Sequence, residues 1–189
     1  MRRSPTHFRP VPRMNAEELR KLQAPLKARY KEHPQTAKQT FRAEGTLLRD
    51  RPACRIETRF GRIDAGLHPA AGGDGTDACS GDMLLESLVA CAGVTLNSVA
   101  TAMSIPFRSA RVIVEGDGDF RGTLGTDKEV PVGVTDIRIR FEIDSDASDE
   151  QLATLLKLTE RYCVIFQTLR SPPRMEASLE RTTPGRGER

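Results

Sequence analysis

A long apolar segment near the middle of the chain, residues 81–103, constrains the fold most strongly. Its leucines and valines lie nearly all round a helical wheel, at Leu84, Leu85, Leu88, Val89, Val94, Leu96 and Val99. A helix that is apolar on every side needs neighbours on every side. We therefore expect it to be the buried centre of the fold, with a second copy of the chain helping to cover it. Polar residues from Glu86 to Ser98 interrupt the segment too often for a membrane span.

Strand patterns occur on both sides of this helix. Alternating apolar residues predict a hairpin over 41–60 that turns at 50–52, and further strands at 110–115, 134–143 and 175–179. A glycine-rich loop, residues 68–80, leads into the central helix, and Ser80 is the expected N-cap.

Two more helices are predicted from their caps. Asn15 precedes leucines at helical spacing, and Pro25 should end or bend that helix. Ser148 and Gln151 form a capping-box pattern, and the helical region that follows should end at Pro172. This order of elements predicts an α+β fold, with two helices available to cover one face of a sheet.

Length and charge indicate how the chain is divided. With 189 residues, of which 38% are hydrophobic, it is long enough for one ordinary domain. The net charge is +3, but residues 1–45 carry +7 and the remainder −4. We expect a disordered basic arm at 1–14, a helical extension at 15–38, the main domain at 39–181 and a frayed tail at 182–189.

Besides a solvated arm, two interpretations of the basic front segment are a secretory signal and a nucleic-acid-binding arm. It is not typical of a secretory signal, because no apolar stretch follows its charges, so we expect a cytoplasmic protein. It is also compatible with nucleic-acid binding, but basic arms are more often only solvated, and we expect no nucleic-acid partner.

Four cysteines, at 54, 79, 91 and 163, are too few and too widely spaced for a disulfide scaffold or a zinc site. We expect neither a metal nor a cofactor. Cys91 lies among leucines in the central helix, and Cys163 has a similar context. The ordinary interpretation of such residues is a small core hydrophobe. Cys54 and Cys79 are expected to be bystanders.

Two segments, Gly81 to Leu96 and Glu160 to Leu169, resemble the OsmC/Ohr family of cysteine-dependent peroxidases. The resemblance covers roughly residues 40–181. It implies an OsmC-like α+β fold, with antiparallel sheets around a long central helix. It also implies an intertwined homodimer whose active sites contain residues from both subunits.

The same resemblance implies roles for particular residues. Cys91 corresponds to the peroxidatic cysteine and Cys163 to the resolving cysteine. The substrate would be an organic hydroperoxide and, more weakly, hydrogen peroxide, with a lipoyl-type or other dithiol as reductant. Val164 stands where the family often has a proline.

A carboxylate and an arginine complete the implied site. A thiol ten residues inside a helix gains little from the helix dipole, so another group must lower its pKa. The resemblance implies an arginine, for which Arg59 and Arg62 both qualify. It also implies a carboxylate that holds the arginine, for which Asp82 is one methylene shorter than the family's glutamate. Glu86 is the weaker candidate, because it points about 140° away from Cys91.

These departures leave an alternative open. A chain of the same fold with an incomplete site would bind a small apolar ligand or sense oxidants without catalysis. A thiol pKa near the free value at Cys91 would favour that interpretation.

Overall fold

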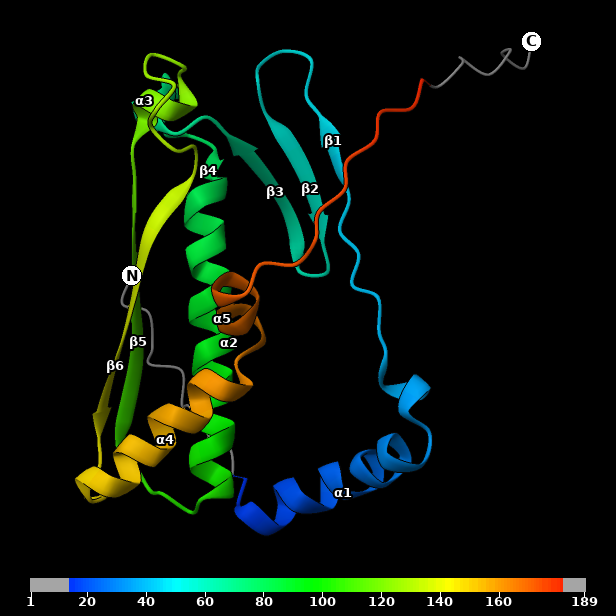
Figure 1. Ribbon diagram of the computed structural model, residues 1–189, viewed down its shortest axis with the longest axis vertical. Coiled ribbons are helices and arrows are strands. Elements are labelled where there is room, and N and C mark those ends of the chain that lie inside the picture. The colour runs from blue at the N-terminus through cyan, green and yellow to red at the C-terminus, as the bar shows by residue number, and fades with distance from the viewer. Residues whose placement is uncertain (1–13, 182–189) are drawn as a thin grey trace, which may run out of the picture.

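The computed structural model describes residues 14–181, which form two sheets and several helices, with one long helix at the centre of the packing (Figure 1). The basic arm predicted for 1–14, apart from Met14, and the tail predicted for 182–189 lie outside the described residues. The elements in chain order are α1 (Ala16–Glu32), η1 (Pro34–Ala37), β1 (Gly45–Leu47), β2 (Cys54–Thr58), β3 (Gly61–Gly66), η2 (Pro69–Ala71), β4 (Ala78–Cys79), α2 (Ser80–Ala102), β5 (Ser109–Gly118), α3 (Phe120–Thr123), β6 (Val134–Asp144), α4 (Asp149–Tyr162) and α5 (Val164–Arg170).

The predicted central helix is confirmed as α2, against which β5, α4 and α5 pack. Its buried residues recur at every fourth position, at Leu88, Ala92, Leu96 and Ala100. This spacing places them on one side of the helix. By length and composition alone α2 could also cross a membrane. In this structure that apolar side is instead the core of the fold.

The other side of α2 is not covered by the described part of the chain. Val94 keeps 69% of its surface exposed although it lies one turn from Cys91. A single copy therefore buries one side of this helix and leaves part of the other side in contact with solvent.

Strands β5 and β6 form a long antiparallel hairpin with one apolar and one charged face. The predicted strands 110–115 and 134–143 are confirmed, and both are longer than expected. Ile137, Ile139 and Phe141 pack toward the α2 core. On the other face Arg111 pairs with Glu142 at 2.5 Å, and Arg138 pairs with Asp117. This division is typical of an antiparallel sheet covered on one side.

The N-terminal sheet has the order β1-β2-β3-β4. The hairpin predicted over 41–60 is confirmed by the antiparallel pairing of β1 with β2. Strand β3 was not predicted, because its sequence, Gly-Arg-Ile-Asp-Ala-Gly, contains a single large apolar residue. Short β4 pairs in parallel with β3 and leads directly into α2, so it joins this sheet to the central helix (Figure 1).

Two local predictions were wrong, and a third was wrong in part. Pro25, which was expected to end or bend its helix, does not end α1, which continues to Glu32. No residue of α1 is buried, so water can solvate the carbonyl that loses its partner at the proline. Ser80 is the first residue of α2 rather than its N-cap, a position that Cys79 occupies without a side-chain hydrogen bond. Residues 175–179 form no strand, and Met175 and Leu179 are almost fully exposed.

The helical region near the C-terminus begins as predicted and then breaks. Ser148 caps α4, and its hydroxyl and the Gln151 side chain form the predicted reciprocal capping box. The chain then leaves the helix at a single residue, Cys163, before α5 begins.

Candidate active site

Cys91 lies in the middle of α2, at the edge of the buried face. It is partly buried and packs against the apolar cluster formed by Leu88, Ala92 and Cys163. The hydroxyl of Thr95, one turn further along, donates a hydrogen bond to the Cys91 carbonyl at 2.8 Å. The regular helix thus fixes the position of this thiol.

Cys163 forms the break between α4 and α5 and is completely buried. Its extended backbone ends one helix and begins the next: its N–H donates to the Thr159 carbonyl at 2.9 Å, and its carbonyl accepts from the Gln167 N–H at 3.0 Å. The Gln167 side chain also donates to the Glu160 carbonyl at 2.7 Å, which ties the two helices together across the break. The break directs the Cys163 thiol toward α2.

The two thiols meet as hydrogen-bond partners, and neither is in a disulfide. Burial raises the pKa of Cys91, but hydrogen bonds from the Ile165 N–H, the Cys163 thiol and the Val164 N–H outweigh it, so the net pKa lies below the usual value. Burial also raises the pKa of Cys163, and its role as donor to Cys91 raises it further. Cys91 is therefore the better thiolate, and Cys163 is the thiol that keeps its proton.

This asymmetry suits a two-thiol reaction. The thiolate is the nucleophilic form of cysteine, and hydrogen-bond donors aimed at its sulfur favour that form. A second thiol in contact can capture an oxidised first sulfur without a large movement of the chain.

The other predicted residues do not meet this pair within one chain. Arg59 lies in the turn between β2 and β3, and Arg62 on β3 pairs with Glu57 at 3.1 Å. Neither arginine is among the main partners of the Cys91 thiol. Asp82 lies in the first turn of α2, about 13 Å from Cys91 along the helix axis, and lines a separate cavity of about 370 Å³ beside His68.

Besides Cys163, the groups that lower the pKa of the Cys91 thiol were missed by sequence reasoning. They are the backbone N–H groups of Val164 and Ile165. Every residue except proline carries such a group. They are free to reach Cys91 because they are in the first turn of α5, where no carbonyl within the helix accepts from them. Only the position of the break at Cys163 would have pointed to them.

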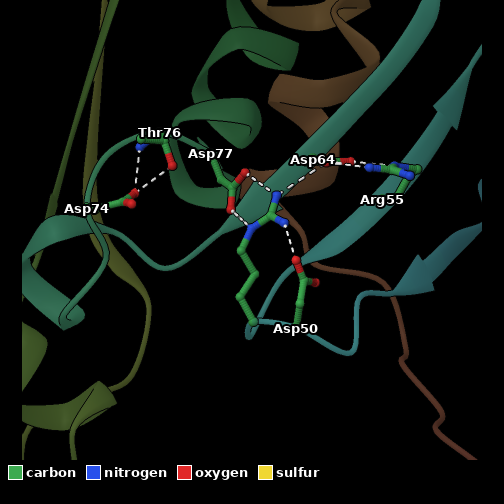
Figure 2. A network of polar contacts seen from close by, with 7 residues as sticks. Asp50, Arg55, Asp64, Asp74, Thr76 and Asp77 are labelled. Carbon is green, nitrogen blue, oxygen red and sulfur yellow. Dashed lines mark hydrogen bonds and ion pairs between the residues drawn. The ribbon is translucent and has the colours of Figure 1, made fainter.

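A second polar cluster, also missed, surrounds Arg51 in the turn between β1 and β2 (Figure 2). Its guanidinium donates two hydrogen bonds to Asp77, each of 2.9 Å, and contacts Asp50 and Asp64 at 3.3 Å. Arg55 holds Asp64 in a bidentate pair at 2.8 Å. The hydrogen bond from Arg51 lowers the pKa of Asp77 despite desolvation. This cluster fastens the hairpin to the loop before α2.

Comparison with known proteins places residues 73–178 within the model of a family described as OsmC-like protein. No curated protein sequence matches the chain. Three solved structures show the fold. An OsmC-like protein from Mycoplasma pneumoniae has 20% identity and a TM-score of 0.59, over 71% of this chain and 90% of that chain.

The other two structures are more distant in sequence. One is named as an organic hydroperoxide resistance protein OsmC from Legionella pneumophila, with 15% identity and a TM-score of 0.55, over 71% of this chain and 93% of that chain. The second is an organic hydroperoxide resistance protein from Elizabethkingia anophelis, with 14% identity and a TM-score of 0.52, over 71% and 92%. At these identities the likeness concerns the fold.

Proposed function

This chain belongs to the OsmC-like protein family, and on that premise we propose that it is a thiol peroxidase that reduces organic hydroperoxides and, more slowly, hydrogen peroxide. One observation carries the proposal: the Cys91 and Cys163 thiols are in contact, with the pKa of the first lowered and that of the second raised. Two structures with this fold are named organic hydroperoxide resistance proteins, which supports the proposed substrate class.

The first step of the proposed reaction is attack by the Cys91 thiolate on the peroxide. Its sulfur forms a bond to the outer oxygen of R–O–O–H while the O–O bond breaks. The sulfur is oxidised to a sulfenic acid, and the peroxide is reduced to an alkoxide that takes a proton and leaves as the alcohol. Apolar side chains next to Cys91 suit the organic group of such a peroxide.

The second step resolves the sulfenic acid. The Cys163 thiol attacks the oxidised Cys91 sulfur, a disulfide forms, and the hydroxyl leaves as water with the thiol proton. A dithiol donor then reduces the disulfide by exchange, returns two protons and two electrons to the cysteines, and becomes a disulfide itself. Burial of Cys163 keeps it protonated until this step, which also protects it from direct oxidation.

We further propose that the working form is an intertwined homodimer. Large apolar side chains stand exposed on the single chain, among them Phe41 at 91%, Phe60 at 96% and Val94 at 69%. Soluble proteins rarely leave such residues uncovered together. Arg59 and Arg62 flank Phe60, so a second copy that covers Phe60 is the proposed route by which one of these arginines reaches a thiolate, with Asp82 as the proposed carboxylate that orients it.

Turnover of a model hydroperoxide tests the proposal. The reduced full-length chain, supplied with a dithiol, is expected to consume cumene hydroperoxide catalytically. Cys91→Ser removes the nucleophile and abolishes turnover. Cys163→Ser allows the first step and blocks resolution by this thiol, so turnover slows and the protein is progressively inactivated by overoxidation. Cys54→Ser, at a partly buried cysteine of β2 outside the pair, is the matched control and retains the parent rate.

Two results would refute the proposal. One is a native chain that does not consume the hydroperoxide in the presence of the dithiol. The other is turnover by Cys91→Ser at the native rate.

A further inference from the structure

The chain leaves the helical path at Cys163, and this break changes which groups pair with the last carbonyls of α4 (Figure 1). In a continuous helix each carbonyl accepts from the N–H four residues further along. The Glu160 carbonyl would then accept from the Val164 N–H. The extended backbone of Cys163, with φ −71° and ψ 110°, separates that pair, and the Val164 N–H donates to the Cys91 sulfur instead.

Gln167 supplies the donor that the Glu160 carbonyl loses. Its side-chain N–H meets that carbonyl at 2.7 Å, and the contact is partly buried. Its backbone N–H donates to the Cys163 carbonyl at 3.0 Å, so Gln167 holds the break with its backbone and with its side chain. A partly buried carbonyl without a donor is costly, because it has given up its hydrogen bonds with water. The Gln167 amide removes the demand that would otherwise draw the Val164 N–H back to α4.

We propose that Gln167 is a positioning residue for Cys91: its amide replaces the Val164 N–H at the Glu160 carbonyl and so leaves that N–H to the thiolate. Gln167 is not among the main partners of the Cys91 thiol, so it acts through Val164. Without this amide, α4 would extend across the break to satisfy Glu160. The Val164 N–H would then leave the sulfur of Cys91.

The rate at which iodoacetamide alkylates Cys91 from pH 6 to 10, followed by peptide mass spectrometry, reports the midpoint of thiolate formation. Gln167→Met keeps the length of the side chain and removes the donor. We expect its midpoint to lie about 0.4 to 1 pH unit above that of the parent chain, the effect of one lost hydrogen bond on a thiolate. Thr168→Val is the matched control. It removes a hydroxyl that donates to the Val164 carbonyl at 2.8 Å within α5, and the midpoint should stay in place.

A double substitution shows whether Gln167 acts through the Val164 N–H. Proline is favoured at the first position of a helix, which Val164 occupies, and the extended backbone of Cys163 is one that a residue before proline adopts. Val164→Pro therefore removes one N–H with little other change, and it should raise the midpoint by a similar amount. In the Val164→Pro chain, Gln167→Met should raise the midpoint no further, because no N–H remains for α4 to recapture.

Three results overturn the assignment. The midpoint of Gln167→Met equals that of the parent, its shift adds in full to the shift of Val164→Pro, or Thr168→Val gives the same shift. If Gln167→Met does not show the far-UV circular dichroism of the parent, the native chain carries the test by ¹⁵N-edited nuclear magnetic resonance. The Val164 amide resonance should then move with the Cys91 midpoint, and one side-chain amide proton of Gln167 should exchange slowly with water. The absence of either signature also overturns the assignment.

These outcomes are separate from those of the peroxidase test, because alkylation uses no peroxide. For the reaction, Gln167 is the residue that keeps Cys91 reactive, and in that respect the inference rests on the proposed function. A midpoint that depends on Gln167, in a chain that does not reduce cumene hydroperoxide, supports the positioning role and refutes the peroxidase. Turnover of cumene hydroperoxide with a midpoint that does not depend on Gln167 refutes the positioning role alone.

Discussion

At the scale of single residues, the chemistry depends on how a thiol inside a helix becomes acidic. Cys91 is too far along α2 to gain from the start of that helix. Instead, two N–H groups at the start of α5 and the thiol of Cys163 donate to its sulfur, and together they outweigh the effect of burial on its pKa. Within one chain, neutral donors rather than an arginine lower the pKa of Cys91.

Replacing Cys163 should therefore make the Cys91 thiol less reactive toward an alkylating reagent, in the absence of any peroxide. Cys163→Ala removes one donor to the Cys91 sulfur, so the pKa of Cys91 rises and a smaller fraction is thiolate at neutral pH. Alkylation of Cys91 by iodoacetamide, followed by peptide mass spectrometry from pH 6 to 10, should show a midpoint shifted upward. Cys79→Ala is the control and should leave the midpoint in place. An unchanged or lower midpoint in Cys163→Ala would contradict the assigned hydrogen bond.

The sequence alone treats both cysteines as core residues, and for Cys163 the complete burial agrees with that interpretation. It was the resemblance to a family that singled out the pair. The N–H donors could not be predicted, because backbone groups leave no mark in a sequence. Nor could the partners of Arg51, since Asp77 lies 26 residues further along the chain.

At the scale of elements, two features position the site. One is the break between α4 and α5, and the other is the anchoring of the N-terminal sheet. The break needs no proline: Cys163 leaves the helix at an extended backbone angle, and Gln167 caps the open end of α4. The sheet is held differently, by the Arg51 cluster that connects the β1–β2 turn to the loop before α2 (Figure 2).

Loss of the Arg51 cluster should destabilise the fold in a manner that depends on pH. The hydrogen bond from Arg51 holds the pKa of Asp77 below its usual range. The contribution of this hydrogen bond to the stability of the fold is present above the carboxyl pKa of the unfolded chain, about 3.9. It is lost as pH falls through the lower pKa of the folded chain. Arg51→Gln should therefore lower the urea midpoint at pH 7, with a smaller difference from the parent at pH 3.

Circular dichroism at fixed protein concentration provides that measurement, because the chain has no tryptophan. Arg42→Gln, which breaks only an exposed pair with Glu44, should leave the midpoint nearly unchanged at either pH. An equal deficit of Arg51→Gln at pH 3 and pH 7 would show that the ionised aspartates do not account for its role.

Sequence patterns predicted the elements whose periodicity is strong, such as α2, β6 and the capped start of α4. They failed where tertiary contacts decide whether a segment forms a strand. Strand β3 forms mainly because β2 supplies a hydrogen-bonding partner along its whole length. Residues 175–179 have an apolar pattern but no neighbouring strand among the described residues, and they remain irregular.

At the scale of the whole molecule, the single chain leaves apolar surface that its own elements do not cover. The exposed side of α2 and the tip of the β2–β3 hairpin are two examples, at Val94 and Phe60. Figure 1 shows the N-terminal sheet and α1 extending away from the α2 core, as expected for a chain that wraps around a second copy.

The chain should therefore sediment as a dimer, with twice the 20.9 kDa mass of one copy. Val94→Lys places a charge on the exposed side of α2, and burying that charge would be costly, so the dimer should dissociate at micromolar concentration. Val132→Lys, which adds the same charge at a similarly exposed valine in the loop before β6, is the control. A native chain that sediments at the mass of one copy would contradict the proposed assembly.

The most direct measurement follows the two thiols after a single oxidation. The reduced full-length chain receives one equivalent of cumene hydroperoxide, remaining thiols are alkylated, and unreduced peptides are analysed by mass spectrometry. We expect one disulfide, between Cys91 and Cys163, with Cys54 and Cys79 recovered as alkylated thiols. Recovery of Cys91 and Cys163 as free thiols, or a disulfide that joins either of them to another cysteine, would contradict it.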